Sequence, residues 1–193
     1  MLSNQQKDVV SFDSELLILV DDQDQEIGNH DKLGCHAGNG TLHRAFSLFI
    51  FNDQGELLLQ RRSANKLLWP LYWSNSCCSH PRQGENMETA ISRRAQQELG
   101  IETKFQFLYK FKYQAPYLDI GSEHELCWVF IGDSNGPIRA NENEIAEWRF
   151  ISAENLDKEL RQKPEQFTPW FKLEWNRLTK DYRTVLSTLN VSL

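Results

Sequence analysis

Short apolar runs separated by turn residues dominate the first third of the chain. Residues 16–20 form one such run, and an acidic turn follows it. Residues 41–51 form a second run, and the Asn-Asp-Gln-Gly sequence at 52–55 is a turn signal before a third run at 56–62. We therefore predict a strand at 16–20 and a hairpin over 41–62. The nearly continuous apolar character is typical of a sheet that is covered on both faces.

Two later segments have helical character. Residues 88–99 stop at Gly100, and glycine tolerates the left-handed backbone that ends many helices. Further on, Thr168 followed by Pro169 is a specific helix start, because threonine caps an N-terminus and proline suits the first helical position. Apolar residues then recur at alternating four- and three-residue steps, which predicts a helix face docked on the sheet. These residues are Phe171, Trp175, Leu178, Tyr182 and Val185.

Further strands are predicted at residues 105–113, 125–131 and 147–151. Together with the two helical segments they indicate a mixed α/β fold in which helices cover a central sheet. No internal repeat or low-complexity linker divides the chain, and 193 residues suit one sizeable domain with a partly enclosed pocket. We predict a single domain over residues 1–193.

The net charge of −6 argues against general nucleic-acid binding, which usually needs a basic field. It leaves room for an anionic small molecule, because a few local cations outweigh distant carboxylates that are screened. The first residues contain no basic region leading into an apolar run, and the longest apolar runs are too short to span a bilayer. We expect no secretory signal, no membrane partner, no nucleic-acid partner and a cytoplasmic location.

Two adjacent thiols and a nearby imidazole carry the first candidate chemistry. Four cysteines, at positions 35, 77, 78 and 127, form no disulfide-rich framework, so reduced thiols are expected. If their segment is extended, Cys78 and His80 share one face and Cys77 points to the other. One face then carries a nucleophile, acid or base beside a metal ligand. The alternative is a free cysteine pair in a turn.

A second candidate site combines imidazoles with carboxylates. Residues two apart on a strand point the same way, so Glu123 and Glu125 can aim at one point while His124 turns away. Three imidazoles and these two carboxylates suit a divalent ion such as Zn²⁺, Mn²⁺ or Mg²⁺. Spacing alone is weak support, because single histidines are more often surface or core residues and acidic pairs usually lie in water. The three imidazoles belong to His36, His43 and His80.

A phosphate-handling signature begins at the end of the thiol segment. From Ser79 the chain resembles the signature of the Nudix family, G-x5-E-x7-R-E-U-x-E-E-x-G-U, in which U is apolar. Ser79 replaces the first glycine, while Arg94 and Gln97 replace two of the acids with which Nudix hydrolases hold Mg²⁺. The resemblance implies the Nudix fold, and the lost acids argue against hydrolysis. The matching residues are Glu85, Arg93, Glu98, Gly100 and Ile101.

The same departures point to a subfamily. From about residue 16 to the helix start at Thr168, the chain resembles the type 1 isopentenyl-diphosphate Δ-isomerases, with many separate motifs in the right order. The resemblance implies a Nudix-type mixed sheet sandwiched between helices, a Nudix core at about 41–160, an N-terminal strand extension and a C-terminal helix. The supporting stretches are residues 41–47, 60–62, 66–70, 73–81, 123–125 and 167–170.

The resemblance also implies catalytic roles. In that family a thiol and a glutamate flank a five-carbon allylic chain, and the matching residues are Cys78 and Glu125. One protonates the double bond while the other removes a proton from the opposite face. Tyr113 matches a phenol that assists the acid, and Trp170 matches an indole that stacks against the cation. Trp170 could instead only pin its helix, and aromatic residues such as Tyr113 are common in strands.

Ligands for metals and for the diphosphate follow from the same resemblance. One Mn²⁺, Zn²⁺ or Mg²⁺ is expected on His36, His43, His80, Glu123 and Glu125. A Mg²⁺ held by Glu98 is expected to bridge the phosphate oxygens. The alternative for Arg94 and Glu98 is a routine helix salt bridge, and for the other cations it is simple solvation. The expected cationic contacts are Lys32, Arg62, Lys66 and Arg94.

The implied protein is an isomerase that interconverts isopentenyl and dimethylallyl diphosphate for isoprenoid biosynthesis, as a monomer with metals and no organic cofactor. A Nudix hydrolase is the first alternative, but it is disfavoured by Arg94 and Gln97 and leaves Cys78 and Trp170 without a task. A non-catalytic metal- or diphosphate-binding module is the second alternative, and it would not need Cys78.

Overall fold

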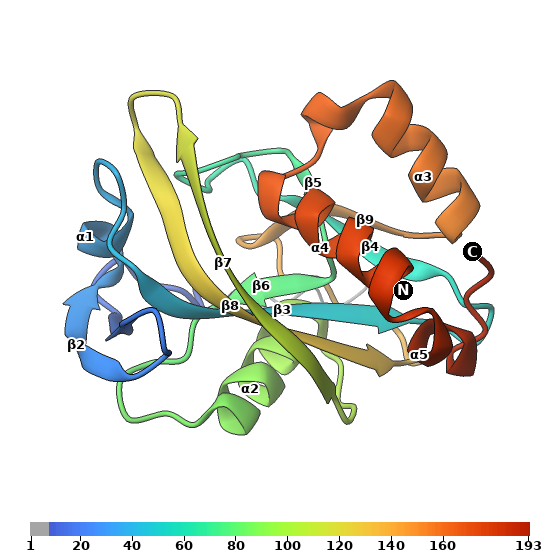
Figure 1. The fold of residues 1–193 in the computed structure, drawn as a ribbon, viewed down its shortest axis with the longest axis horizontal. Coiled ribbons are helices and arrows are strands. Elements are labelled where there is room, and N and C mark those ends of the chain that lie inside the picture. Colours follow the sequence, from blue (N-terminus) through green and yellow to red (C-terminus); the bar gives the residue numbers. More distant parts are fainter. Residues whose placement is uncertain (1–7) are drawn as a thin grey trace.

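The computed structural model describes residues 8–193, and these are organised around one mixed sheet of nine strands (Figure 1). The strands are β1 (Leu16–Val20), β2 (Glu26–Asp31), β3 (His43–Phe51), β4 (Leu57–Arg62), β5 (Trp73–Ser74), β6 (Cys77–Ser79), β7 (Gln106–Tyr117), β8 (Gly121–Asp133) and β9 (Ile145–Ile151).

β3 is the strand around which the sheet is built. It pairs in parallel with β8 along its whole length, from His43 opposite Glu125 to Phe51 opposite Asp133. It also pairs antiparallel with β1 at its start, with β6 in its middle and with β4 at its end. β8 forms a long hairpin with β7, and β4 is extended by β5 and β9. Every residue of β3 except Arg44 is buried, so the strand covered on both faces is confirmed.

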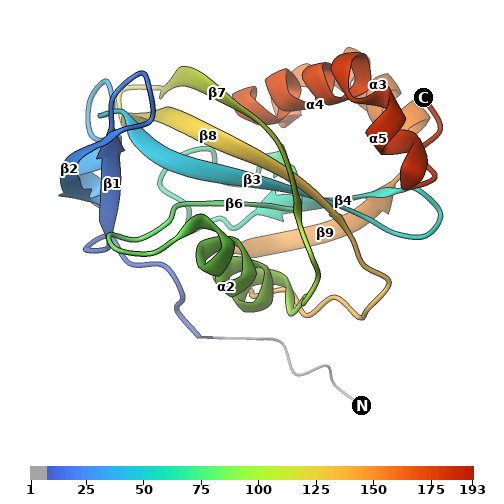
Figure 2. The same cartoon turned by 60° about the horizontal axis from the view of Figure 1, so that its bottom comes forward.

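Helices cover both faces of this sheet, which confirms the predicted α/β fold. They are α1 (Lys32–His36), α2 (Met87–Leu99), α3 (Ala153–Gln162), the 3₁₀ turn η1 (Pro164–Gln166), α4 (Pro169–Asp181) and α5 (Arg183–Thr188). Figure 2 shows α2 on one side of the strands and α4 with α5 on the other. Alternate residues of β3 enter two cores, with Phe46 and Leu48 toward α2 and Phe49 and Phe51 toward α4. Among residues 8–193, no helix is long and apolar enough to cross a membrane.

The predicted hairpin over residues 41–62 is confirmed at its turn, but its two strands do not stay paired beyond the turn. β3 and β4 pair only where Phe51 lies opposite Leu57. The two strands diverge after that pair because β6 takes the neighbouring place beside β3, opposite Phe46, Ser47 and Leu48. This insertion brings the thiol segment into the centre of the molecule.

The predicted helix at 88–99 is confirmed as α2. The Asn86 side chain caps its start by accepting a hydrogen bond of 2.8 Å from the Thr89 amide. At its end Gly100 adopts a left-handed φ of 68° and its amide donates to the carbonyls of Ala95 and Gln96. Glycine is therefore used here for the conformation that the sequence predicted.

The C-terminal helix begins as predicted but ends earlier. Pro169 occupies the first turn of α4, and the helix stops at Asp181, so Val185 of the predicted stripe belongs to α5. Thr168 holds the N-cap position without a side-chain capping bond. Its hydroxyl instead lies 3.0 Å from the Ser74 hydroxyl in the buried interior, which fastens the start of α4 to β5.

The turn between β3 and β4 leaves no room for a side chain at Gly55. Its φ is +73°, and an added Cβ would lie 2.2 Å from the carbonyl oxygen of Asn190 near the C-terminus. Gly84 has a φ of +76° and nothing within 4 Å of an added Cβ, so it is a matched control. We expect Gly84→Ala to lower the free energy of unfolding by about 1 kcal/mol through backbone strain. Gly55→Ala should cost about 1–3 kcal/mol more because the C-terminal segment must move. Urea unfolding of both variants measures the difference, and equal losses would contradict this packing.

Candidate active site

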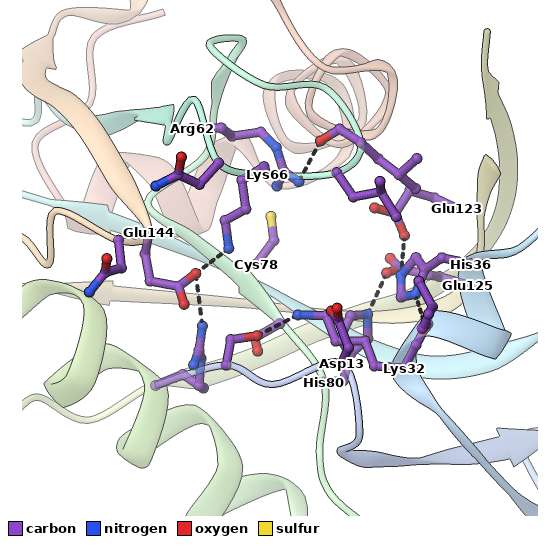
Figure 3. Close-up of a pocket in the computed structure, with 18 of the residues that line it drawn as sticks. Asp13, Lys32, His36, Arg62, Lys66, Cys78, His80, Glu123, Glu125 and Glu144 are labelled. Carbon is purple, nitrogen blue, oxygen red and sulfur yellow. Dashed lines mark hydrogen bonds and ion pairs between the residues drawn. The ribbon is translucent and has the colours of Figure 1, made fainter. Parts of the chain in front are cut away.

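A cavity of about 480 Å³ lies beside α1. Its walls come from segments far apart in the sequence: residues before β1, α1, the end of β4 and the loop behind it, β6, α2, β7, β8 and α4. In Figure 3, Cys78 lies between a charged end with Lys66 and Glu144 and a second end with His36 and Glu125. The predicted site residues therefore form three groups: a central thiol, a cationic end and a histidine–glutamate end.

The Cys78 thiol faces the cavity, whereas Cys77 is fully buried in the core beside α2. The Cys78 S–H donates to Asn75 Oδ1 at 2.7 Å, and the sulfur accepts from Trp170 Nε1–H at 3.2 Å. Asn75 is held in this orientation because its amide nitrogen donates to two main-chain carbonyls, those of Leu48 and Cys77. Burial raises the pKa of Cys78 to about 12, so the thiol keeps its proton at neutral pH.

Glu125 and Tyr113 form a hydrogen-bonded pair of acidic groups in the same cavity. They lie opposite each other in the β7–β8 pairing, and the Tyr113 hydroxyl donates to Glu125 Oε2 at 2.6 Å. His80 Nε2 lies 2.9 Å from the other carboxylate oxygen. Burial and then the charge of neighbouring Glu123 raise the pKa of Glu125 well above its ordinary value. A carboxyl so placed can hold a proton or accept one.

The five predicted metal ligands converge. One ligand atom from each lies within 4.8 Å of those of the others. Strand alternation aims both glutamates of β8 at this point, and the β3–β8 register sets His43 opposite Glu125. His124, between the two glutamates, turns away and lies 3.2 Å from the carbonyl of Gly40. The converging residues are His36, His43, His80, Glu123 and Glu125.

The hydrogen bonds around this cluster fit a bound cation. His36 Nδ1–H donates to the Lys32 carbonyl at 2.6 Å, and His43 Nδ1–H donates to the Thr41 carbonyl at 2.7 Å. Each Nε2 atom therefore points into the cluster, where His36 Nε2 lies 2.9 Å from Glu123 Oε2 and His43 Nε2 lies 3.7 Å from Glu125 Oε1. Within residues 8–193, His43 Nε2 is fully buried without an aligned hydrogen-bond partner. A divalent cation would satisfy this atom and neutralise the two converging carboxylates, so these residues fit a metal.

Four cations line the other end of the cavity. Lys66 forms an ion pair with buried Glu144, and Lys32 donates to the Ser11 hydroxyl. Burial and then the charge of Lys66 lower the pKa of Lys32 to about 8. Arg62 Nη2 donates to the carbonyl of Leu68 at 2.9 Å, which orients the guanidinium. This concentration of positive charge suits a small anion. The four cations are Lys32, Arg62, Lys66 and Arg94.

Glu98, predicted to hold Mg²⁺, lies behind these cations. Its Oε1 accepts from Arg94 Nε at 2.9 Å and from Arg94 Nη2 at 2.5 Å, and both side chains are buried. Arg94 faces the cavity, but Glu98 is not among the described residues that line it. The pair therefore forms a buried, oriented ion pair and not a routine surface salt bridge.

Aromatic side chains pack together beside Cys78. The Trp170 ring packs edge-on against Trp69, with ring centres 5.2 Å apart, and lies 6.1 Å from Tyr113. The guanidinium of Arg62 lies 5.2 Å from the centre of the same indole. Trp170 thus lies against the thiol, a phenol and a cation in the cavity.

Comparisons with known proteins show which family the chain belongs to. A model of the NUDIX domain matches residues 41–171. A protein from Photorhabdus laumondii named isopentenyl-diphosphate Delta-isomerase 1 is 43% identical over 170 residues, which are 87% of this chain and 97% of that protein. The chain belongs to the isopentenyl-diphosphate Delta-isomerase family. A second member, from Paenarthrobacter aurescens, is 41% identical and covers 86% of this chain and 91% of its own.

Solved structures support the Nudix-type fold of this family member. A Deinococcus radiodurans protein superposes with a TM-score of 0.64 at 24% identity, over 77% of this chain and 90% of that one. A MutT protein from Methanosarcina mazei gives a TM-score of 0.62 at 19% identity, over 74% and 96% of the two chains. At these identities the likeness concerns the fold alone.

Three polar residues around the cavity of this isomerase-family chain escaped sequence reasoning. Glu144 is buried at the cationic end, where the charges of Lys66 and Arg94 overcome burial and lower its pKa to about 2. Asn75 orients the thiol, and Ser47 lies opposite Cys78 in the β3–β6 pairing. A polar serine inside the apolar run of β3 could have indicated that Ser47 has a special environment. No sequence pattern indicates the role of Glu144, because the residues around it resemble an ordinary polar turn.

The histidine–glutamate cluster predicts which imidazoles retain metal. His80→Ala removes an imidazole whose Nε2 points into the cluster, so we expect loss of most of a tightly held divalent ion. His124→Ala is the matched control, since His124 lies between both glutamates yet faces away. Metal content after dialysis against a weak chelator, measured by atomic emission, gives the answer. Retention of a full equivalent by His80→Ala would remove His80 from the ligand set.

Proposed function

We propose that this protein interconverts isopentenyl and dimethylallyl diphosphate in the cavity between Cys78 and Glu125. The observation that carries the proposal is the sharing of one cavity by two proton-transfer groups and four cations. Two groups that exchange protons with carbon account for movement of a double bond, and the cations account for a diphosphate. A hydrolase would use neither the thiol nor the indole.

The cationic end holds the diphosphate and leaves the five-carbon chain beside Cys78. Lys66 and Arg94 are already oriented by Glu144, so few side chains need to be ordered when the anion enters. Arg62 joins the two ends because it faces the cavity and also the Trp170 ring. This fixed arrangement sets the distance between the phosphate and the reacting carbons.

Proton transfer then moves the double bond. One group adds a proton to the terminal alkene carbon, which leaves positive charge on the adjacent tertiary carbon, and the other removes a proton from the carbon on its far side. Cys78 keeps its proton through burial, and Glu125 exchanges protons with Tyr113 over 2.6 Å. Donor and acceptor exchange roles in the two directions of the reversible reaction. The indole face of Trp170 stabilises the transient cation, and the apolar surface of Trp170 and Tyr113 limits its contact with water.

Divalent metals complete the proposed site. One Mn²⁺, Zn²⁺ or Mg²⁺ bound by the three histidines and two glutamates would favour the carboxylate form of Glu125 and fix its position. A Mg²⁺ that neutralises the diphosphate is proposed near Arg94. Glu98 remains its predicted ligand, although the carboxylate must first be released in part from Arg94. We further propose that the protein acts as a monomer in the cytoplasm, where its reduced cysteines persist.

A solvent-isotope experiment tests the activity. Purified protein is incubated with isopentenyl diphosphate and Mg²⁺ in deuterated water, and the products are examined by NMR and mass spectrometry. We expect dimethylallyl diphosphate that carries deuterium at the newly formed methyl group. Release of phosphate without isomerisation would instead support a hydrolase, and the absence of any turnover would support a binding module.

The two adjacent thiols give an internal control for the same assay. Cys78→Ala removes a proton-transfer group and should lower kcat by at least about 100-fold. Cys77→Ala leaves the cavity intact and should affect activity little, while it destabilises the core beside α2 modestly. Isomerisation rates and urea unfolding separate the two effects. Equal loss of kcat in both variants would refute the division of roles between these thiols.

A further inference from the structure

A buried carboxyl group lies behind the cavity wall and has no role in the proton transfers described above. Glu174 is on α4, four residues after Trp170, and only 1% of it is exposed. Its side chain points at the sheet, where Oε1 lies 3.7 Å from Cys127 Sγ. Its main-chain carbonyl accepts a hydrogen bond of 3.3 Å from the Tyr109 hydroxyl. Glu174 is therefore outside the cavity but directly behind it.

Among the described residues, no positively charged group compensates the burial of Glu174. Within residues 8–193 its Oε2 is buried without an aligned hydrogen-bond partner, and no lysine or arginine pairs with the carboxyl group. Burial raises the pKa of Glu174 to about 8, although contacts with Ser47 and Cys127 act in the opposite direction. The carboxyl group is thus mainly neutral at neutral pH. A buried, incompletely bonded carboxyl costs stability that an apolar residue would not, which points to a functional use.

Ser47 connects this carboxyl group to the thiol. Ser47 lies opposite Cys78 in the β3–β6 pairing, and its Oγ is 3.5 Å from Cys78 Sγ. The same oxygen is 3.4 Å from Cys127 Sγ, which in turn lies 3.7 Å from Glu174 Oε1, and the Ser47 hydroxyl is one of the two groups that lower the pKa of Glu174. A serine hydroxyl has one proton to donate and two lone pairs with which to accept. Its neighbours decide where that proton points.

The protonation of Glu174 sets the direction of the Ser47 proton. A carboxylate at position 174 would be the strongest nearby acceptor and would take the Ser47 proton, leaving only lone pairs toward Cys78. A neutral carboxylic acid can donate to Ser47 Oγ instead. The Ser47 proton is then available to the sulfur of Cys78.

We propose that Glu174, as a neutral carboxylic acid, is a positioning residue that directs the Ser47 hydroxyl toward Cys78 Sγ. When Cys78 gives its proton to the alkene, the S–H bond breaks, the new C–H bond forms and the sulfur keeps the electron pair. Ser47 O–H and Trp170 Nε1–H then both donate to the thiolate, one from the buried side and one from the cavity side. Glu174 keeps its own proton throughout. This role rests on the proposed isomerase activity.

Two substitutions at position 174 distinguish a role as hydrogen-bond donor from a role in packing alone. Glu174→Gln keeps the size and a donating N–H, so we expect kcat within a few-fold of the wild type. Glu174→Leu fills the space without a donor, and kcat should fall by about 10- to 100-fold, the worth of one hydrogen bond to a charged group. KM should not change in either variant, because the cations that bind the diphosphate lie elsewhere. Unfolding curves show whether each variant is folded.

Ser47→Ala shows whether the effect passes through the hydroxyl. It should lower kcat as much as Glu174→Leu, and the double variant should lose no more than either single variant. If the loss of kcat in the double variant equalled the product of the losses in the two single variants, the residues would act independently and the proposal would be overturned. So would a kcat of Glu174→Gln as low as that of Glu174→Leu, or a change confined to KM.

An infrared measurement tests the neutral carboxyl without relying on turnover. The difference spectrum between the wild type and Glu174→Gln at neutral pH should contain the C=O stretch of a protonated carboxyl, and Ser47→Ala should shift that band. A carboxylate band in its place would overturn the proposal even in an active enzyme. If the wild type fails to isomerise its substrate while the protonated band is present and shifts, the proposed function fails and the hydrogen bond stands.

Discussion

The parallel pairing of β3 with β8 fixes the register on which the whole site depends. It sets His43 beside Glu125, and alternation along β8 then turns Glu123 to the same point. A shift of one residue would turn both glutamates into the opposite core and leave three histidines without their carboxylates. The apolar residues of β3 that enter two cores hold this register, because any slip would expose or misplace them. Packing on both faces is therefore what aligns the polar residues.

Mutual pairing makes so many buried ionisable groups tolerable. Lys66 pairs with Glu144, and Arg94 pairs with Glu98. In each pair the attraction between the charges offsets the free energy lost when they leave water. The same pairs hold the cations in place before an anion arrives. At the other end, His43 Nε2 has no aligned hydrogen-bond partner among the described residues, and it faces two carboxylates that converge on the same point, which fits a metal. The cavity thus has one end prepared for an anion and another prepared for a cation, with the thiol between them.

Side-chain parity made much of this arrangement predictable from the sequence. It separated Cys78 from Cys77 and His124 from its two glutamate neighbours, because strands alternate regardless of their surroundings. Turn and cap residues located α2 and the start of α4 for similarly local reasons. Glu144 and the burial of Glu98 could not be predicted, since they depend on how α2 meets the segment before β9. Local pattern carries no information about such contacts between distant segments.

The first turn of α4 is held against the sheet close to the thiol segment, and this position brings the helix to the site. The Thr168 hydroxyl contacts Ser74 in the interior, so the helix start is fixed relative to β5 and to the neighbouring thiol segment. One turn separates Trp170 from Glu174, and a helix places such residues on the same face. Trp170 therefore reaches Cys78 directly, while Glu174 reaches the strand behind it through Ser47. The match to the NUDIX domain ends at residue 171, before Glu174. A helix at the margin of the shared fold thus places Trp170 against the Cys78 sulfur and Glu174 against Cys127 behind it.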